Sequence, residues 1–312
     1  MPDLLAAGRS WSVPAGSNLL DALNQAGLRV PYSCRAGSCH ACLVRCIAGE
    51  VQDDMPEALD AAQRAQGWCL ACQCRVSGDL AVEVFDPLRD GLPADILACD
   101  WLSADVLRLR VQPHKPLRYS AGQHLLLWTA DGLARPYSLA SVPGLDSWLE
   151  FHIDCHERGA FSDAARTFQP GAPLRLGELR GGALHYDPDW SERPLWLLAA
   201  GTGLAPLWGI LREALRQQHQ GPIRLLHVAR ERSELYLAGP LCELAAQYSQ
   251  VQVEQLDATE LAAVLAELKL VSRQTRALLC GSPASVERFA RRLYLAGLPR
   301  NQLLADVFLP RA

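Results

Sequence analysis

The sequence has no excess of basic residues. Its 30 lysines and arginines stand against 34 aspartates and glutamates, which gives a formal net charge of -4. A slightly acidic chain has no overall attraction for phosphate backbones or for anionic lipid surfaces. We therefore expect neither a nucleic acid nor a membrane as the main partner.

A long hydrophobic run and a secretory signal are also missing. The most apolar segment, residues 195–211, is interrupted by three glycines, a threonine and a proline, whereas a spanning helix needs about 20 apolar residues in succession. The opening residues 1–16 contain no charged region followed by a sustained apolar stretch. We expect a cytoplasmic protein that acts as a monomer.

Cysteine is abundant, and its distribution argues against a disulfide scaffold. The count of 11 is odd, and the cysteines cluster between positions 34 and 74. Cys34, Cys39, Cys42 and Cys72 have the spacing of a plant-type 2Fe-2S loop. Two bridged irons need four thiolates, so three come from one wrapping loop and the fourth folds back from elsewhere. The sequence therefore predicts these four cysteines as ligands of a 2Fe-2S cluster.

Two other interpretations of this loop remain open, namely a zinc site and buried thiols. Zinc knuckles favour paired CxxC units, whereas four residues separate Cys34 from Cys39. The cysteines outside the ligand spacing are expected to be buried as small hydrophobic residues: Cys46, Cys69, Cys74 and Cys99.

The chain is too long for one hydrophobic core, because single cores stop growing at roughly 250 residues. Residues 1–86 contain the cysteine loop, a short amphipathic helix and alternating strands. Residues 87–93 are polar and turn-rich, and we expect a linker there. Short alternating runs in residues 94–188 predict an antiparallel barrel or sandwich. Residues 189–312 alternate apolar strands with helices, which predicts a parallel α/β sheet.

The motif RPYS begins at Arg135 in the β-rich segment. Arg135 can hold a phosphate with its guanidinium fork, while Tyr137 and Ser138 reach a flavin ring. FHID, residues 151–154, and GAFS, residues 159–162, follow, and GAFS is a turn that can offer backbone N–H groups to a pyrophosphate. An ordinary strand with an exposed arginine is the alternative interpretation of RPYS alone.

The run GTGLAP, residues 201–206, joins an apolar strand to a helix. Gly201 and Gly203 let the chain turn sharply and let a dinucleotide pyrophosphate approach the helix N-terminus. The run is not the GxGxxG fingerprint, so a simple pair of turn glycines is the alternative. LLCGSP, residues 278–283, follows a second apolar strand, and a buried strand-end cysteine is one interpretation of its Cys280.

Three charged residues bear on the choice of nucleotide. Glu234 can accept a hydrogen bond from a ribose 2′-hydroxyl and repel a 2′-phosphate, which favours NADH. Arg230 and Arg232 can instead bind that phosphate, which favours NADPH. We expect NADH, and a solvated helix entry is the alternative explanation of all three charges.

Taken together, these motifs resemble a known family. Residues 30–74 look like the ferredoxin domain of bacterial multicomponent oxygenase reductases, and the motifs from RPYS to CGSP are similar, in order, to those of the ferredoxin-NADP reductase superfamily. The resemblance covers essentially the whole chain. It implies an α+β multidomain fold with a β-grasp 2Fe-2S ferredoxin domain, an antiparallel β-barrel flavin domain and an α/β parallel-sheet pyridine-nucleotide domain. In relatives with the ferredoxin first, such as naphthalene- and benzoate-dioxygenase-type reductases, the flavin is FAD.

The resemblance also implies roles for individual residues. Cys280 would lie beside the nicotinamide ring, and Ser138 and Asp306 would tune the flavin, so these three are the candidate catalytic residues. The candidate cofactor-binding residues are Arg135, Pro136, Tyr137, Ser138, His152, Ile153, Asp154, Gly159, Ala160, Phe161, Ser162, Gly201, Thr202, Gly203, Pro206, Arg230, Glu234, Cys280, Gly281 and Phe308. Phe308 would stack on the flavin ring, with a plain core phenylalanine as the alternative. His40 departs from the family, which often has glycine there, and this puts the cluster's reduction potential in question.

The predicted function follows from electron counting. NADH gives up two electrons together, whereas a 2Fe-2S cluster takes one at a time, so a flavin must accept the pair and release single electrons. The resemblance implies a reductase that passes electrons from NADH through FAD and the cluster to an oxygenase component or another one-electron acceptor protein. Two alternatives remain open: a reductase for radical-type sugar deoxygenation, and a redox-sensing or carrier protein that does not oxidise nucleotide.

Overall fold

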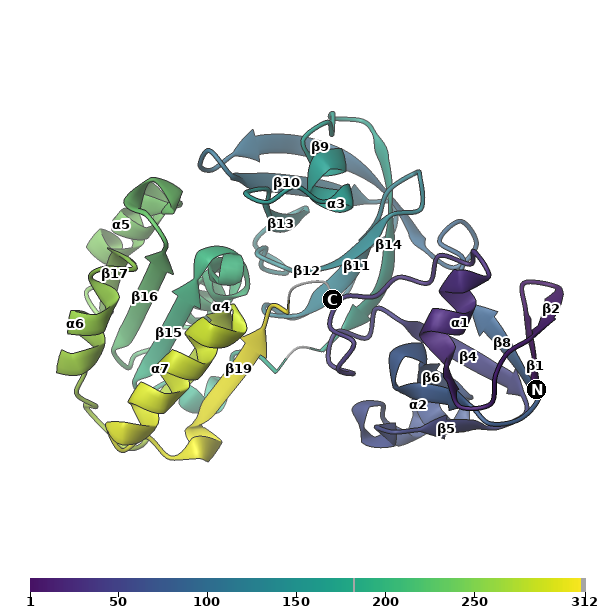
Figure 1. Ribbon diagram of the computed structural model, residues 1–312. Coiled ribbons are helices and arrows are strands. Elements are labelled where there is room, and N and C mark those ends of the chain that lie inside the picture. Colours follow the sequence, from purple (N-terminus) through teal and green to yellow (C-terminus); the bar gives the residue numbers. More distant parts are fainter. Residues whose placement is uncertain (182, 310–312) are drawn as a thin grey trace.

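The N-terminal part of the chain folds around the apolar face of helix α1. In the computed structural model, which describes residues 1–181 and 183–309, a mixed sheet has the order β2-β1-β8-β4-β6 and a second, small sheet the order β3-β7-β5 (Figure 1). Leu19, Leu20 and Leu23 of α1 are fully buried, because they recur at helical spacing on one face. The elements are β1 (Asp3–Ala6), β2 (Arg9–Ser12), β3 (Ser17–Asn18), α1 (Leu19–Gln25), β4 (Leu43–Ala48), β5 (Val51–Asp53), η1 (Pro56–Ala58), α2 (Ala61–Ala65), β6 (Trp68–Leu70), η2 (Ala71–Gln73), β7 (Cys74–Val76) and β8 (Leu80–Val84).

The middle part forms a curled antiparallel sheet of six strands in the order β12-β11-β14-β9-β10-β13. Its two edge strands approach each other: the Ala140 N–H, just after β12, donates to the carbonyl of Glu150 on β13 at 2.8 Å. Alternate residues such as Leu109 and Phe151 are buried inside, as expected for a barrel. The elements are β9 (Leu92–Trp101), β10 (Val106–Pro113), β11 (His124–Trp128), β12 (Ala134–Ser138), β13 (Leu149–Asp154), α3 (Ala160–Ala165) and β14 (Pro173–Arg180).

The C-terminal part is a parallel sheet in the order β17-β16-β15-β18-β19, so the strand order reverses between β15 and β18. Helices α4 and α5 pack on one face and α6 and α7 on the other. Strand β19 points towards the middle of the molecule, where the three parts meet (Figure 1). The elements are η3 (Pro188–Trp190), β15 (Leu195–Ala200), η4 (Gly201–Gly203), α4 (Leu204–Arg216), β16 (Ile223–Ala229), η5 (Arg232–Glu234), α5 (Ala238–Gln247), β17 (Val251–Asp257), α6 (Leu261–Glu267), β18 (Arg276–Gly281), α7 (Pro283–Leu295), η6 (Arg300–Gln302) and β19 (Leu303–Val307).

The predicted fold class is confirmed, but two barrel strands were not foreseen. Strand β9 begins at Leu92, within the predicted linker 87–93, and its first residues pair with β14. Both strands contain proline and charged residues that lower their strand propensity. They form because pairing within the barrel outweighs that local preference.

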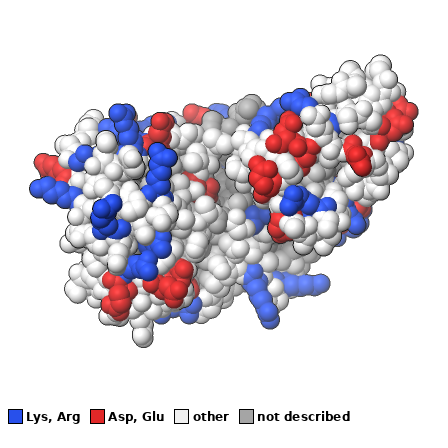
Figure 2. Space-filling model, turned by 90° about the horizontal axis from the view of Figure 1, so that it is seen from below, with Lys and Arg blue, Asp and Glu red and all other residues white. Residues whose placement is uncertain are grey.

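Two surface properties bear on the predicted partners. Among helices in the described ranges, none combines the length and the apolar character needed to cross a bilayer. On the face shown in Figure 2, Lys and Arg side chains are interspersed with Asp and Glu, so this face presents no large field of one sign.

Candidate functional site

The cysteine loop curves because several of its residues adopt left-handed backbone conformations. Gly37 and His40 have φ angles of 77° and 53°. The resulting turns direct the N–H groups of Ala36 and Cys39 to Cys34 Sγ, at 3.3 and 3.4 Å. Backbone donors of this kind stabilise negative charge on a metal-bound sulfur.

The fourth cysteine reaches the loop from η2. The Cys72 N–H donates to Cys42 Sγ at 3.5 Å. Gln73 Nε2 donates to Cys72 Sγ at 3.2 Å and to the Arg35 carbonyl at 2.9 Å, so it ties η2 to the loop. The fold therefore brings together residues that are 30 positions apart in the sequence.

The four thiols form two hydrogen-bonded pairs. Cys39 donates to Cys34 and Cys42 donates to Cys72, which lowers the pKa of Cys34 to about 4 and that of Cys72 to about 6. Within residues 1–181 and 183–309, no three His, Cys, Asp or Glu side chains surround a site for a single metal ion. Two pairs suit a two-iron cluster, because each iron takes two protein ligands. The donor set and its backbone N–H groups fit a 2Fe-2S cluster.

The cysteines outside the ligand spacing divide into two groups. Cys69 and Cys74 are buried, as predicted. The prediction is wrong for Cys46 and Cys99, which are only partly buried. Cys46 lies at an irregularity in the pairing of β4 with β8, where its thiol contacts the Ala48 carbonyl.

His40 lies where the cysteine loop meets the barrel. Glycine adopts its φ of 53° without steric cost, which explains why glycine suits this position in the family that the sequence resembles. The half-buried ring lines a small pocket together with His124, Trp128 and Arg180 of the barrel. Burial lowers the pKa of His40.

The RPYS and GAFS motifs are brought together by the fold. Tyr137 on β12 and Phe161 on α3 have ring centroids 5.1 Å apart. The Ser162 hydroxyl donates to the carbonyls of Glu157 and Gly159 at 3.0 and 3.1 Å. Because Gly159 offers no side-chain cap to α3, the backbone of this turn, rather than the Ser162 hydroxyl, is suited to a pyrophosphate.

Arg135 and Pro136 lie in the β11–β12 ladder, and Pro136 is paired with Leu126. Arg135 lines a groove of about 470 Å³ together with Arg29 and Arg35 of the N-terminal part. Several guanidinium groups around one groove suit a phosphate. This arrangement fits the phosphate-binding role predicted for Arg135.

The FHID residues are placed less uniformly than the motif implies. His152 is almost fully buried and hydrogen-bonds to Glu150 and Tyr236. Ile153 packs in the barrel core, while Asp154 is exposed at the end of β13. Of the three, only Asp154 presents its side chain to an open surface.

The GTG and CGSP turns lie backbone to backbone at the carboxyl ends of β15 and β18. A Cβ atom at Gly203 would lie 2.3 Å from the Cys280 carbonyl oxygen. A Cβ atom at Gly281, which has a φ of 144°, would lie 2.8 Å from the Cβ atom of Ala200. Ligands of open α/β sheets bind in the crevice where the strand order reverses, and both turns border this crevice.

Helix α4 begins in that crevice without a side-chain cap. Thr202 is partly exposed at the turn, and Pro206 is buried in the first turn of the helix. Uncapped N–H groups and the positive end of the helix dipole favour an anion. These features fit the pyrophosphate of a pyridine nucleotide.

His124 lies next to two of the three candidate catalytic residues, Ser138 and Asp306, and the third, Cys280, lies next to Asp306. Cys280 and Asp306 are register partners on β18 and β19. The carboxyl of Asp306 interacts electrostatically with His124, which is the register partner of Ser138 across β11 and β12. Burial raises the pKa of both Cys280 and Asp306. The Cys280 thiol is enclosed in the core, so the structure places it beneath the turn.

Phe308 continues β19 past Asp306. Its N–H donates to the Gly281 carbonyl at 2.8 Å, and its ring packs partly buried against the same core as Cys280. It therefore lies at the CGSP turn, and its stacking on a flavin ring stays a prediction.

The residues that bear on nucleotide choice are paired with one another. Arg230 forms an ion pair with Glu234 at 3.1 Å. Arg232 contacts Asp257 at 3.6 Å and also bonds to Glu260. Each arginine thus already has a carboxylate partner.

Sequence reasoning missed His124 and Tyr236. His124 lies in the predicted β-rich segment 94–188, but its contacts with Ser138 and Asp306 depend on sheet register and on docking between parts of the chain. Tyr236 lies two positions after Glu234. Its role depends on a contact with His152, which is 84 residues away in the sequence. No local pattern marks either residue.

Comparison with protein families gives two matches. Residues 5–77 match the 2Fe-2S iron-sulfur cluster binding domain, and residues 197–292 match the oxidoreductase NAD-binding domain. These ranges contain all four predicted cluster ligands and both nucleotide turns.

Whole-chain relatives point the same way. The chain is 33% identical to the naphthalene 1,2-dioxygenase system ferredoxin–NAD(P)+ reductase component of Pseudomonas putida, over 95% of this chain and 94% of the relative. It is also 33% identical to terephthalate 1,2-dioxygenase reductase component 1 of a Comamonas species, over 71% and 68%. The crystal structure of an Amycolatopsis cytochrome P450 reductase superposes with a TM-score of 0.67 and 26% identity, covering all of both chains.

Proposed function

The chain belongs to the ferredoxin–NAD(P)+ reductase components of bacterial oxygenase systems, and we propose that it passes electrons from NADH through FAD and a 2Fe-2S cluster to an oxygenase component or another one-electron acceptor protein. It is an NAD(P)H-dependent oxidoreductase. Bound FAD supplies the chemistry that turns a two-electron donor into a source of single electrons.

The position of His124 carries this proposal. Its ring interacts with Asp306 at the nucleotide end and contacts the Cys39 backbone in the cysteine loop. Its strand partner is Ser138. The predicted entry point for electrons and the predicted exit point therefore meet on one strand of the barrel, which supports transfer within a single chain.

Each group of residues has a distinct task in this proposal. Cys34, Cys39, Cys42 and Cys72 would hold the cluster, and the RPYS strand and the GAFS turn would hold the flavin. The GTG and CGSP turns hold the nucleotide in the crevice between β15 and β18. Asp306, whose pKa is raised by burial, is suited to hold or release a proton near the flavin.

The charges near Glu234 support NADH as the donor. Arg230 and Arg232 are each neutralised by carboxylates, and a 2′-phosphate would have to displace them. A ribose 2′-hydroxyl needs only an acceptor such as Glu234.

The state of the cysteines supports a location in the cytoplasm. None of the eleven cysteines forms a disulfide, as expected in a reducing compartment. We place the protein there as a monomer that docks transiently with its acceptor.

Stopped-flow mixing with NADH tests the function. In protein loaded with flavin and cluster, the flavin absorbance should fall first and the cluster absorbance afterwards. A purified protein that contains no flavin would contradict the proposal. A flavin that NADH does not bleach, next to a cluster that dithionite reduces, would favour an electron carrier instead.

A further inference from the structure

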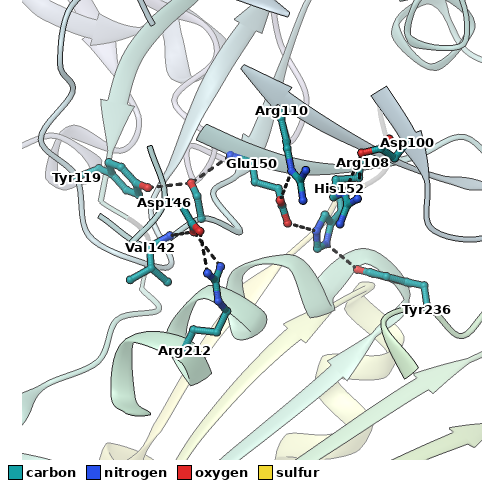
Figure 3. Close-up of polar contacts among 11 residues, drawn as sticks. Asp100, Arg108, Arg110, Tyr119, Val142, Asp146, Glu150, His152, Arg212 and Tyr236 are labelled. Atoms are coloured by element: carbon teal, nitrogen blue, oxygen red, sulfur yellow. Dashed lines mark hydrogen bonds and ion pairs between the residues drawn. The ribbon is translucent and has the colours of Figure 1, made fainter. Parts of the chain in front are cut away.

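A buried polar chain crosses the boundary between the barrel and the parallel sheet. On the barrel side, Arg110 Nε donates to Glu150 at 3.0 Å, and Glu150 lies 3.2 Å from His152 Nε2. His152 Nδ1 is 3.2 Å from the hydroxyl of Tyr236, which lies across the boundary (Figure 3). His152 and Tyr236 are only 3% and 1% exposed, so water does not compete for this contact.

Chemistry determines the direction of each hydrogen bond. Burial raises the pKa of Glu150, but hydrogen bonds from His152 and Arg110 outweigh it and lower the pKa to about 2. Glu150 is therefore a carboxylate that only accepts, and His152 Nε2 must carry the proton. Burial also lowers the pKa of His152, which keeps the ring neutral, so its Nδ1 accepts from the Tyr236 hydroxyl.

The chain continues from Tyr236 to the nucleotide turn. The Tyr236 carbonyl accepts from Gln255 Nε2 at 3.0 Å, and the same amide donates to His227 Nδ1 at 3.2 Å. His227 Nε2 then donates to the Gly201 carbonyl at 3.2 Å. The Tyr236 ring packs edge-on against His152 and His227, with centroids 5.3 and 5.2 Å away. Directional contacts thus run without a break from the barrel to the GTG turn.

A second contact holds helix α4 against the barrel. Arg212 makes two hydrogen bonds of 2.8 Å to Asp146, in the connection between β12 and β13 (Figure 3). One turn earlier, a Cβ atom at Gly209 would lie 3.3 and 3.2 Å from the carbonyl oxygens of Leu139 and Ala140. These two residues directly follow RPYS. The helix that starts at the nucleotide turn is therefore seated on the end of the flavin strand.

We propose that His152 and Tyr236 are positioning residues for hydride transfer, because they lock the GTG turn at a fixed position relative to β13 of the barrel. The inference rests on the proposed function, which assigns flavin to the barrel and nucleotide to the turn. In that step the hydride leaves the nicotinamide and joins the flavin, so NADH is oxidised and the flavin reduced. A displacement of about 1 Å between reacting groups can cost about 100-fold in rate, so a small loss of register should be visible in this step.

Tyr236→Phe removes the hydroxyl and keeps the ring, and the chain offers a matched control. Tyr186 is also buried, its hydroxyl is 3.0 Å from His219 Nδ1, and their rings also pack edge-on. That pair packs beside Trp190 of η3, beyond the C-terminal end of α4, whereas the GTG turn lies at the opposite end of this helix. Tyr186→Phe should therefore cost similar stability without moving the turn.

The test compares flavin reduction by saturating NADH in the holoproteins. Tyr236→Phe should slow it by about tenfold or more, with the dissociation constant of NADH nearly unchanged, whereas Tyr186→Phe should match the wild type. In the absence of nucleotide, amide hydrogen exchange of residues 201–205 should be faster only in Tyr236→Phe. Equal flavin reduction and equal exchange in both variants would overturn the inference.

Two further comparisons keep the result decisive. If Tyr236→Phe does not fold, Glu150→Gln weakens the same chain from the barrel side and should change flavin reduction and exchange in the same direction. If the wild type itself is not reduced by NADH, the proposed function fails. If the wild type is reduced and Tyr236→Phe is reduced equally fast, only the positioning role fails.

Discussion

Replacing Gly203 by alanine tests the close approach of the two nucleotide turns. The backbone of Gly203, with φ of -57° and ψ of -14°, suits alanine, so the effect comes from the added methyl group alone. That Cβ would lie 2.3 Å from the Cys280 carbonyl oxygen, whereas real Cβ contacts stay beyond 3.0 Å. The two turns must therefore separate by about 0.7 Å, the difference of these distances. Both are backbone, so no side-chain rotation relieves the clash.

The expected cost follows from this displacement. Overpacking of this kind destabilises a protein by about 1–3 kcal/mol. A shift approaching 1 Å at the reacting groups lowers a rate by up to about 100-fold. We expect Gly203→Ala to lower the free energy of unfolding by about 1–3 kcal/mol. We also expect it to slow flavin reduction by NADH by about 10- to 100-fold.

Anaerobic stopped-flow at the flavin absorbance measures the rate, and denaturant unfolding measures the stability. Gly239→Ala is the control, because its Cβ meets no atom within 4 Å at the start of α5. It should leave flavin reduction unchanged and gain up to about 1 kcal/mol from helix propensity. If the rate of flavin reduction in Gly203→Ala is within about twofold of the wild-type rate, the turn does not position the nucleotide and the reasoning is wrong.

Three further predictions address the other parts of the molecule. Cys72→Ser should abolish NADH-dependent cytochrome c reduction and leave NADH–ferricyanide activity at the flavin largely intact, because it removes one cluster ligand; equal loss of both activities would contradict this division of labour. His40→Gly should raise the free energy of unfolding by about 1 kcal/mol, because glycine adopts the left-handed backbone conformation of residue 40 without strain. A lower unfolding temperature of the variant would show that contacts of the His40 ring outweigh the backbone strain. Folding lowers the pKa of Glu150 from 4.5 to about 2, so its ionised carboxylate should stabilise the fold above about pH 4.5. About 2 kcal/mol of this stabilisation should be lost between pH 6 and pH 3. In denaturant unfolding at these two pH values, the free energy of unfolding of Glu150→Gln should fall by less than that of the wild type, and an equal fall would refute the assignment.

The motifs could be predicted because their chemistry is local. Three of the four cysteines lie within nine residues, and a wrapping loop with small residues is enough to expect a cluster. The glycines of GTG and CGSP mark turns at strand ends whatever the rest of the fold does. For this reason the cluster ligands and the nucleotide turns followed from short segments, whereas the flavin followed from the resemblance to a family.

Individual side-chain roles were harder to predict. His152 and Ile153 belong to the FHID motif, which was predicted to bind a cofactor, yet the His152 side chain lies at the boundary with the parallel-sheet part and that of Ile153 in the barrel core. Alternation along β13 decides which side chains point into the barrel core and which point away from it. The docking of the parallel-sheet part then decides what covers the side chains that point away. The half-exposed thiols of Cys46 and Cys99 show the same dependence on strand context.

The sequence by itself determined the cluster ligands and the nucleotide turns, because ligand spacing and turn glycines act over a few residues, while FAD followed from the resemblance of the whole chain to a family. Only the tertiary structure decided how these parts are held together. His124 and Ser138 are paired across the neighbouring strands β11 and β12, and Tyr236 contacts His152, which is 84 residues away in the sequence. Such contacts arise from the packing of whole sheets and helices against one another, and no local pattern encodes which two side chains will meet.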